Sequence, residues 1–141
     1  LHHVCGKKPD YVIDIATLTG ACAVALGKEF AGVMGTCGEL IDLLEQAGGE
    51  TGERVWPLPL VDAHREALES SVATLKNIGP REGGALTAAA FLSHFVTDDT
   101  CWAHVDIAGP AWADKRTPLG PKGGTGFGAR LLARLVELLS E

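Results

Sequence analysis

The chain has 141 residues, of which 46% are hydrophobic, and it carries a formal net charge of −6. This length fits one domain, and the apolar content is enough for a core, which argues against a disordered chain. The acidity argues against a nucleic-acid partner, because phosphate backbones repel negative charge and the longest basic runs are the pairs Lys7–Lys8 and Lys115–Arg116. No apolar run approaches the roughly 20 residues of a membrane span.

The four cysteines are Cys5, Cys22, Cys37 and Cys101. None of them forms a Cys-x-x-Cys pair, and the neighbours of Cys22 and Cys101 are apolar. This usage is typical of a reducing compartment rather than of a disulfide framework. The sequence therefore predicts buried free thiols and a cytoplasmic location.

In the first part of the chain, short β-branched runs predict strands, and apolar residues at helical spacing predict helices. The expected elements are a strand over 11–15, a short helix over 21–26 ending at Gly27, a strand over 30–34, and a helix over 39–47 that stops at Gly48–Gly49.

The second part begins with a Pro-punctuated extended segment, 55–60, which is no central strand because proline lacks a ladder donor. The further expected elements are a helix from the N-cap Asp62 to Leu75, a loop over 77–84, a helix over 86–96, a strand over 102–108, a long Gly-rich loop over 113–128, and an amphipathic helix over 129–139. Alternating strands and helices predict an α/β fold with a mostly parallel sheet flanked by helices.

Two acids, Asp14 and Asp106, lie inside apolar strands, where a carboxylate needs partners. They are candidates for metal ligands or a general base, and equally for structural groups held by backbone or Arg donors. His2, His3 and Cys5 are close in sequence but lack a metal-ligand spacing, so a solvated helix end is the simpler interpretation. No Ser/His/Asp order indicates nucleophilic catalysis.

The glycines of 124–128 precede a helix, as in a phosphate-binding loop. A dinucleotide-binding fingerprint follows a strand and belongs to a βαβ unit, whereas these glycines lie near the C-terminus with no strand after them, so a flexible helix entry is the simpler interpretation. The segment 79–87 has no Lys at the position that a P-loop needs. A nucleotide-binding domain thus stays a minor alternative.

Several ordered segments resemble the cytosolic leucine aminopeptidase family, and together they cover nearly the whole chain. They are Asp14–Ala21, Thr51–Pro59, Asn77–Gly79, Gly84–Leu92, Trp102–Gly109 and Gly124–Leu132. The resemblance implies an enzyme that removes N-terminal leucine and similar residues from peptides. It also implies two divalent metals, zinc or manganese, that activate a bridging water.

In that family, acidic metal ligands and a catalytic Arg lie in an Asn-Thr-Asp-Ala-Glu-Gly-Arg motif that this sequence does not contain. We therefore expect no metal ligand and no catalytic residue in residues 1–141, which would be a C-terminal portion of the catalytic domain, inactive alone. The missing N-terminal part of the same enzyme would be its partner. A non-catalytic α/β interaction or assembly module is the alternative.

The resemblance carries over a substrate pocket. Thr17, Leu18 and Gly20 match a loop that touches substrate through its backbone in the family. Ala108 and Ala111 match positions on the pocket for the N-terminal side chain, where small residues leave room for a leucine-sized group. The family also implies a homo-oligomer, a hexamer, and the irregular segments around Trp56 and Trp112 favour partly exposed aromatic rings at subunit contacts.

Overall fold

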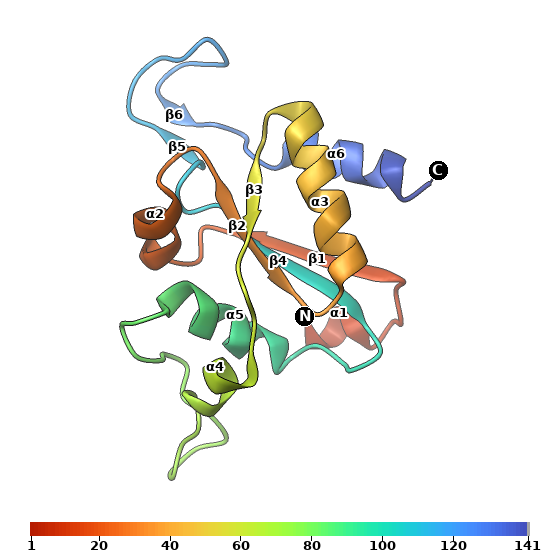
Figure 1. The fold of residues 1–141 in the computed structure, drawn as a ribbon, viewed down its shortest axis with the longest axis vertical. Coiled ribbons are helices and arrows are strands. Elements are labelled where there is room, and N and C mark those ends of the chain that lie inside the picture. Colours follow the sequence, from red (N-terminus) through yellow and green to blue (C-terminus); the bar gives the residue numbers. More distant parts are fainter. Residues whose placement is uncertain (141) are drawn as a thin grey trace.

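The computed structural model describes residues 1–140 as a four-stranded sheet with helices on both faces and a small two-stranded hairpin (Figure 1). The helices are α1 (His2–Cys5), α2 (Gly20–Leu26), α3 (Gly38–Thr51), α4 (Asp62–Glu66), α5 (Gly84–Ser93) and α6 (Ala129–Leu138). The strands are β1 (Tyr11–Ala16), β2 (Ala31–Gly35), β3 (Val55–Pro57), β4 (Cys101–Asp106), β5 (Trp112–Ala113) and β6 (Gly123–Gly124).

The strand order in the main sheet is β1-β4-β2-β3. The β1–β4 and β2–β3 pairs are parallel, and the β2–β4 pair is antiparallel. The prediction of a mostly parallel α/β sheet is therefore confirmed. The Pro-containing strand β3 lies at an edge of the sheet, where a missing ladder donor costs least.

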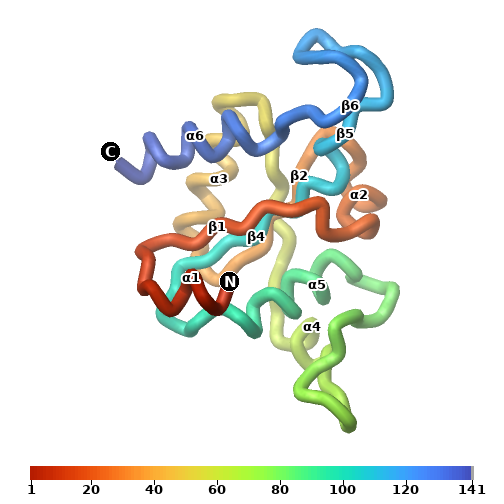
Figure 2. Tube along the Cα trace, turned by 180° about the vertical axis from the view of Figure 1, so that it is seen from behind, coloured from red at the N-terminus to blue at the C-terminus, as the bar shows by residue number. Residues whose placement is uncertain are grey.

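The two faces of the sheet differ in chemistry because side chains alternate along each strand. Helices α3 and α6 pack together against one face (Figure 2). That face has an apolar core formed by alternate strand residues and helix leucines, among them Val33, Val105, Leu40, Leu44, Leu131 and Leu135. The opposite face, with α2 and α5, carries Trp102 of a smaller apolar cluster together with Asp14, His104 and Asp106.

The predicted end of the helix over 39–47 is wrong. Helix α3 continues through Gly48 and Gly49 to Thr51 and ends at Gly52, which adopts the left-handed conformation with φ 74°. Gly48 lies inside the helix. A Cβ at this position would meet the carbonyl oxygen of Glu53 at 2.9 Å, closer than side chains ordinarily approach. That glycine therefore permits close packing rather than ending the helix.

The helix predicted from Asp62 to Leu75 is only α4, Asp62–Glu66, and its N-cap is Val61 rather than Asp62. The hydroxyl oxygen of Ser70 accepts hydrogen bonds from the backbone N–H groups of Val72 and Ala73. Such local bonds compete with helical ones and favour a turn. Val72, which lies within the predicted helix, is consequently outside any helix and 94% exposed.

The prediction of four free thiols is wrong for one pair. Cys37 and Cys101 form a disulfide with their Cα atoms 5.0 Å apart, whereas Cys5 and Cys22 are free and buried as expected. The antiparallel β2–β4 pairing aligns Gly35 with Ala103 and so brings the two cysteines, 64 residues apart in sequence, to one end of the sheet. Sequence spacing does not reveal that proximity.

The long segment predicted as a loop over 113–128 contains Ala113 of β5 and the whole of β6, which pair as an antiparallel hairpin with Trp112 opposite Gly124. Figures 1 and 2 both show this segment extending away from the main sheet. Within residues 1–140, no helix has the length and apolar character needed to cross a membrane.

Candidate functional site

Two loops meet where the parallel strands β1 and β4 end. The first loop, 17–20, follows β1, and the second, 107–111, follows β4; the backbone N–H of Ile107 donates to the carbonyl oxygen of Ala16 at 2.8 Å. The carboxyl ends of strands are where open α/β sheets bind ligands. The five pocket residues expected from sequence all belong to these two loops or to the first residue of α2.

The carboxylate of Asp106 connects the two loops. Its side chain is fully buried, and its Oδ1 accepts hydrogen bonds from the backbone N–H groups of Leu18 and Ala108, both at 3.1 Å. Its Oδ2 accepts from the backbone N–H of Thr19 at 3.1 Å and from the Thr19 hydroxyl at 2.7 Å. Because each oxygen serves two donors, this one side chain fixes the loop after β1 relative to the loop after β4.

Thr19 also links Asp106 to helix α2. As the N-cap residue, its hydroxyl oxygen accepts from the backbone N–H of Cys22 at 3.0 Å. The Cys22 thiol in turn lies 3.6 Å from the carbonyl oxygen of Asp106. Burial raises the pKa of the Cys22 thiol, and the nearby charge of Asp106 raises it further, so the sulfur stays neutral and acts as a weak donor.

The expected pocket residues differ in exposure. Thr17, Leu18 and Gly20 are exposed, whereas Ala108 and Ala111 are partly buried. A Cβ at Gly20 would meet no atom within 4 Å, so open space lies in front of this position. The loop after β1 is thus fixed by Asp106 and has an exposed surface that a ligand can contact.

Gly109 explains how the second loop reaches this position. A Cβ at Gly109 would lie 2.0 Å from the carbonyl oxygen of Gly27, which ends α2. Only glycine allows the chain after β4 to pass this close to another backbone. The glycine at the end of this motif therefore lets the second loop pack against the end of α2.

The N-terminus of α6, the candidate phosphate site, is already occupied by a side chain. The buried carboxylate of Glu53 accepts hydrogen bonds through Oε2 from the backbone N–H groups of Gly128 at 3.0 Å and Leu131 at 2.8 Å. Its Oε1 accepts from Arg130 Nε at 3.2 Å. Since an internal anion takes the donors that a phosphate would need, the glycine-rich segment acts as a helix entry.

Asp14, the other acid noted in the sequence, joins β1 to β4. Its Oδ2 accepts from Trp102 Nε1 at 2.6 Å, and its Oδ1 lies 2.5 Å from His104 Nδ1. His104 is 1% exposed, and its Nε2 has no hydrogen-bond partner among residues 1–140. The contact with a carboxylate favours the His104 tautomer that carries a proton on Nδ1. Asp14 and Asp106 thus both have hydrogen-bond partners within the chain, as structural carboxylates do.

Sequence reasoning missed His104 and Glu53. Polar residues at alternate positions of a strand were the available signal for His104, because they share one face with Asp106. Nothing local indicated the role of Glu53, whose partners lie 75 to 78 residues later in the chain.

The remaining metal candidates lie apart. His2 and His3 are exposed, whereas Cys5 on the same short helix is buried. In the part of the chain that the structure describes, no group of three or more His, Cys, Asp or Glu side chains is placed to hold a metal ion. These residues do not fit a metal centre.

The sheet, with one exposed and one largely buried loop fixed at the ends of adjacent parallel strands, has the arrangement in which α/β domains bind ligands. Residues 1–133 match the family model described as "Cytosol aminopeptidase family, catalytic domain". The chain belongs to this family and forms part of its catalytic domain.

Related sequences and a solved structure agree with this assignment. The chain is 48% identical over 136 residues to a probable cytosol aminopeptidase of Synechococcus sp. (strain CC9605), covering 96% of this chain and 28% of that protein. It is 53% identical over 132 residues to a probable cytosol aminopeptidase of Geobacter sp. (strain M21), covering 94% of this chain and 27% of that protein. A tomato leucine aminopeptidase mutant superposes with a TM-score of 0.90 at 38% identity, covering 96% of this chain and 26% of that one. The chain thus spans under a third of the length of these relatives.

Proposed function

We propose that the protein containing this chain is a metal-dependent aminopeptidase that releases N-terminal leucine and similar residues from peptides. Membership of the cytosol aminopeptidase family supports the reaction class. The observation that supports a role for this chain is the position of the loop 17–20, exposed at the end of β1 and fixed by Asp106.

Within such an enzyme, the chain supplies part of the substrate pocket. The backbone of Thr17, Leu18 and Gly20 contacts the peptide, and Ala108 and Ala111 border the space for its first side chain. Small side chains at the last two positions leave room for a group of the size of leucine. Asp106 takes no part in bond breaking but holds both loops in register, which keeps the substrate oriented.

The metal chemistry belongs to the rest of the protein. We propose two divalent ions, zinc or manganese, bound by side chains outside residues 1–140; bound ions of this kind polarise a carbonyl and lower the pKa of a water. The residues described here bind and orient the peptide beside that centre.

We place the intact enzyme in the cytoplasm as a homo-oligomer, a hexamer. Trp56 and Trp112, at 53% and 56% exposure, are available for subunit contacts. Trp is enriched at the centres of protein interfaces, so these rings support an assembly that uses this region.

Hydrolysis of leucine p-nitroanilide by the intact, purified protein tests the proposal. Turnover is expected to disappear with a chelator and to return with zinc or manganese, and the 141 residues alone are expected to show none. A folded, metal-loaded intact protein without turnover would favour the alternative, a non-catalytic α/β interaction or assembly module.

A further inference from the structure

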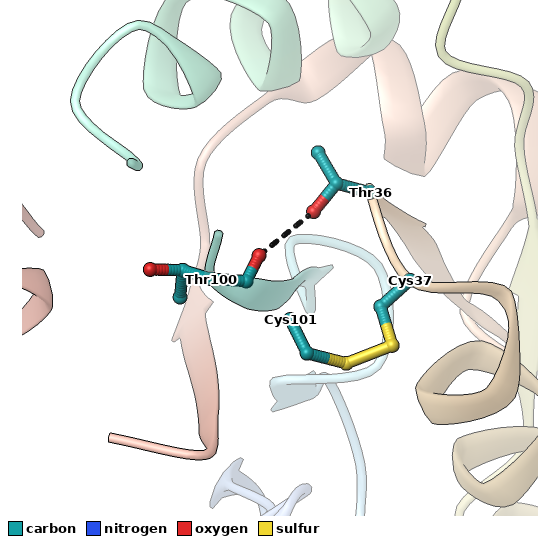
Figure 3. The surroundings of a disulfide bond; sticks show 4 residues. All are labelled: Thr36, Cys37, Thr100 and Cys101. Carbon is teal, nitrogen blue, oxygen red and sulfur yellow. Dashed lines mark hydrogen bonds between the residues drawn. A yellow bond between two sulfur atoms is a disulfide. The ribbon is translucent and has the colours of Figure 1, made fainter. Parts of the chain in front are cut away.

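The Cys37–Cys101 disulfide lies at the opposite end of β4 from the substrate loops. Cys101 is the first residue of β4, and Cys37 is the N-cap residue of α3, just beyond the end of β2 (Figure 3). The pair has no part in the pocket proposed above, whose anchor Asp106 is the last residue of the same strand.

Both sulfur-bearing residues are reachable from outside. They line a pocket of about 450 Å³ together with residues that include Lys8, Asp10, Glu39 and Asp99. Cys37 and Cys101 are partly exposed, whereas the free thiols of Cys5 and Cys22 belong to residues only 2% and 1% exposed. A disulfide that solvent reaches is open to thiol exchange, which an enclosed one resists.

The backbone around the disulfide is held by bonds that do not depend on sulfur. The backbone N–H of Thr36 donates to the carbonyl oxygen of Trp102 at 2.9 Å. The Thr36 hydroxyl donates to the carbonyl oxygen of Thr100 at 3.3 Å, and this second bond is the one drawn in Figure 3. These bonds extend the β2–β4 pairing up to the cysteines. Two thiols formed by reduction would therefore stay adjacent and ready to re-form the bond.

From these observations we propose that Cys37 and Cys101 form a reversible redox site that a dithiol reductant opens through this pocket. A thiolate of the reductant attacks Sγ of Cys101, the S–S bond breaks, and Cys37 leaves as a thiolate. The second thiol of the reductant then resolves the mixed disulfide. Two electrons and two protons pass to the cysteine pair, and the reductant becomes a disulfide; a disulfide oxidant reverses the exchange.

The charge of the pocket that contains the disulfide favours some reductants over others. Three acids, Asp10, Glu39 and Asp99, and one cation, Lys8, line the pocket. This excess of negative charge repels anionic thiols such as glutathione, so a neutral or basic dithiol is the fitting class. The redox state of the pair sets the stability of the fold, since the bond links positions 64 residues apart and restrains the unfolded chain. This chemistry is independent of peptide hydrolysis.

The test uses the intact, oxidised protein under native conditions. Samples are treated with dithiothreitol or with a thioredoxin-type dithiol protein and alkylated, and each cysteine peptide is read by mass spectrometry. Cys37 and Cys101 are expected to be alkylated only after either dithiol, and Cys5 and Cys22 only after denaturation. After the dithiol is removed, an excess of hydroxyethyl disulfide, a neutral disulfide oxidant, should abolish the reactivity of the pair. Labelling by dithiothreitol alone would assign the site to small dithiols.

A pair that stays linked under native conditions, at dithiol concentrations that reduce it in denaturant, would overturn the proposal, as would a pair that never links in the oxidised protein. Reduction should also lower Tm by about 2 to 4 °C, and the Cys37→Ser/Cys101→Ser variant should show no response to dithiol. The peptide readout on the unmodified protein decides the matter even where that variant folds poorly. Glu39→Gln should speed reduction by glutathione more than reduction by dithiothreitol, and equal acceleration would contradict the selection by charge.

Discussion

Replacing Asp106 by Asn tests how the two loops are held together. Both carboxylate oxygens accept two hydrogen bonds each, so the amide NH₂ must face two donors in either orientation. The less costly orientation directs NH₂ towards Thr19, whose hydroxyl oxygen can accept from it. The backbone N–H of Thr19 then loses its acceptor, and the remaining bonds lose their charge assistance. We expect a loss of about 3 kcal/mol in unfolding free energy.

The assay is urea denaturation of the intact protein, followed by steady-state kinetics with a leucyl substrate. Alongside the loss of stability, kcat/KM should fall by about tenfold or more because the loop loses its fixed geometry, while bound metal stays unchanged. Asp42→Asn, an exposed change on α3, is the matched control and should stay within about 0.5 kcal/mol. An Asp106→Asn protein as stable and as active as the control would refute the anchoring role.

Two further changes probe groups near the loops and at α6. Glu53→Gln should lower the free energy of unfolding by only about 1 kcal/mol, since the amide oxygen can still accept from Gly128 and Leu131 and the lost partner, Arg130, is half exposed. Glu53→Ala leaves both backbone N–H groups unpaired and should lower it by about 3 kcal/mol, as measured by chemical denaturation. Equal losses in these two variants would contradict the capping role. The pKa of the Cys22 thiol is higher in the folded than in the unfolded protein. The stabilisation linked to this thiol is therefore fully present below the ordinary thiol pKa and decreases as the pH rises through and above it. Between about pH 8 and about pH 10 the decline in Tm should be smaller in Cys22→Ala, and an identical decline would argue against a buried neutral thiol.

The elements predicted well are those that carry their own periodic signal. The strands over 11–15 and 102–108 and the last helix appear within two residues of their predicted bounds, because apolar patterning and burial agree there. The Pro-rich segment also lies at the sheet edge, as the missing donors require.

The features missed depend on partners far away in sequence. Gly48 is a packing contact rather than a helix stop only because the backbone at Glu53 turns back on it. The disulfide exists because β2 and β4 pair antiparallel, a pairing that no local pattern specifies. The apolar neighbours of Asp106 identify it as a buried acid, but its role depends on the loops after β1 and β4, which meet at its carboxylate.

The most direct test of the account compares Gly20→Val with Gly38→Val in the intact enzyme. Both glycines begin a helix, and a Cβ at either would meet no atom of this chain within 4 Å, so both variants should fold with nearly unchanged stability. The account predicts that Gly20→Val lowers kcat/KM for leucyl substrates by about tenfold or more, with metal content unchanged, because the side chain fills space that the peptide occupies. Gly38→Val should behave as the unmodified enzyme. Equal kinetics for the two variants would place the loop 17–20 outside the substrate pocket and contradict the central claim.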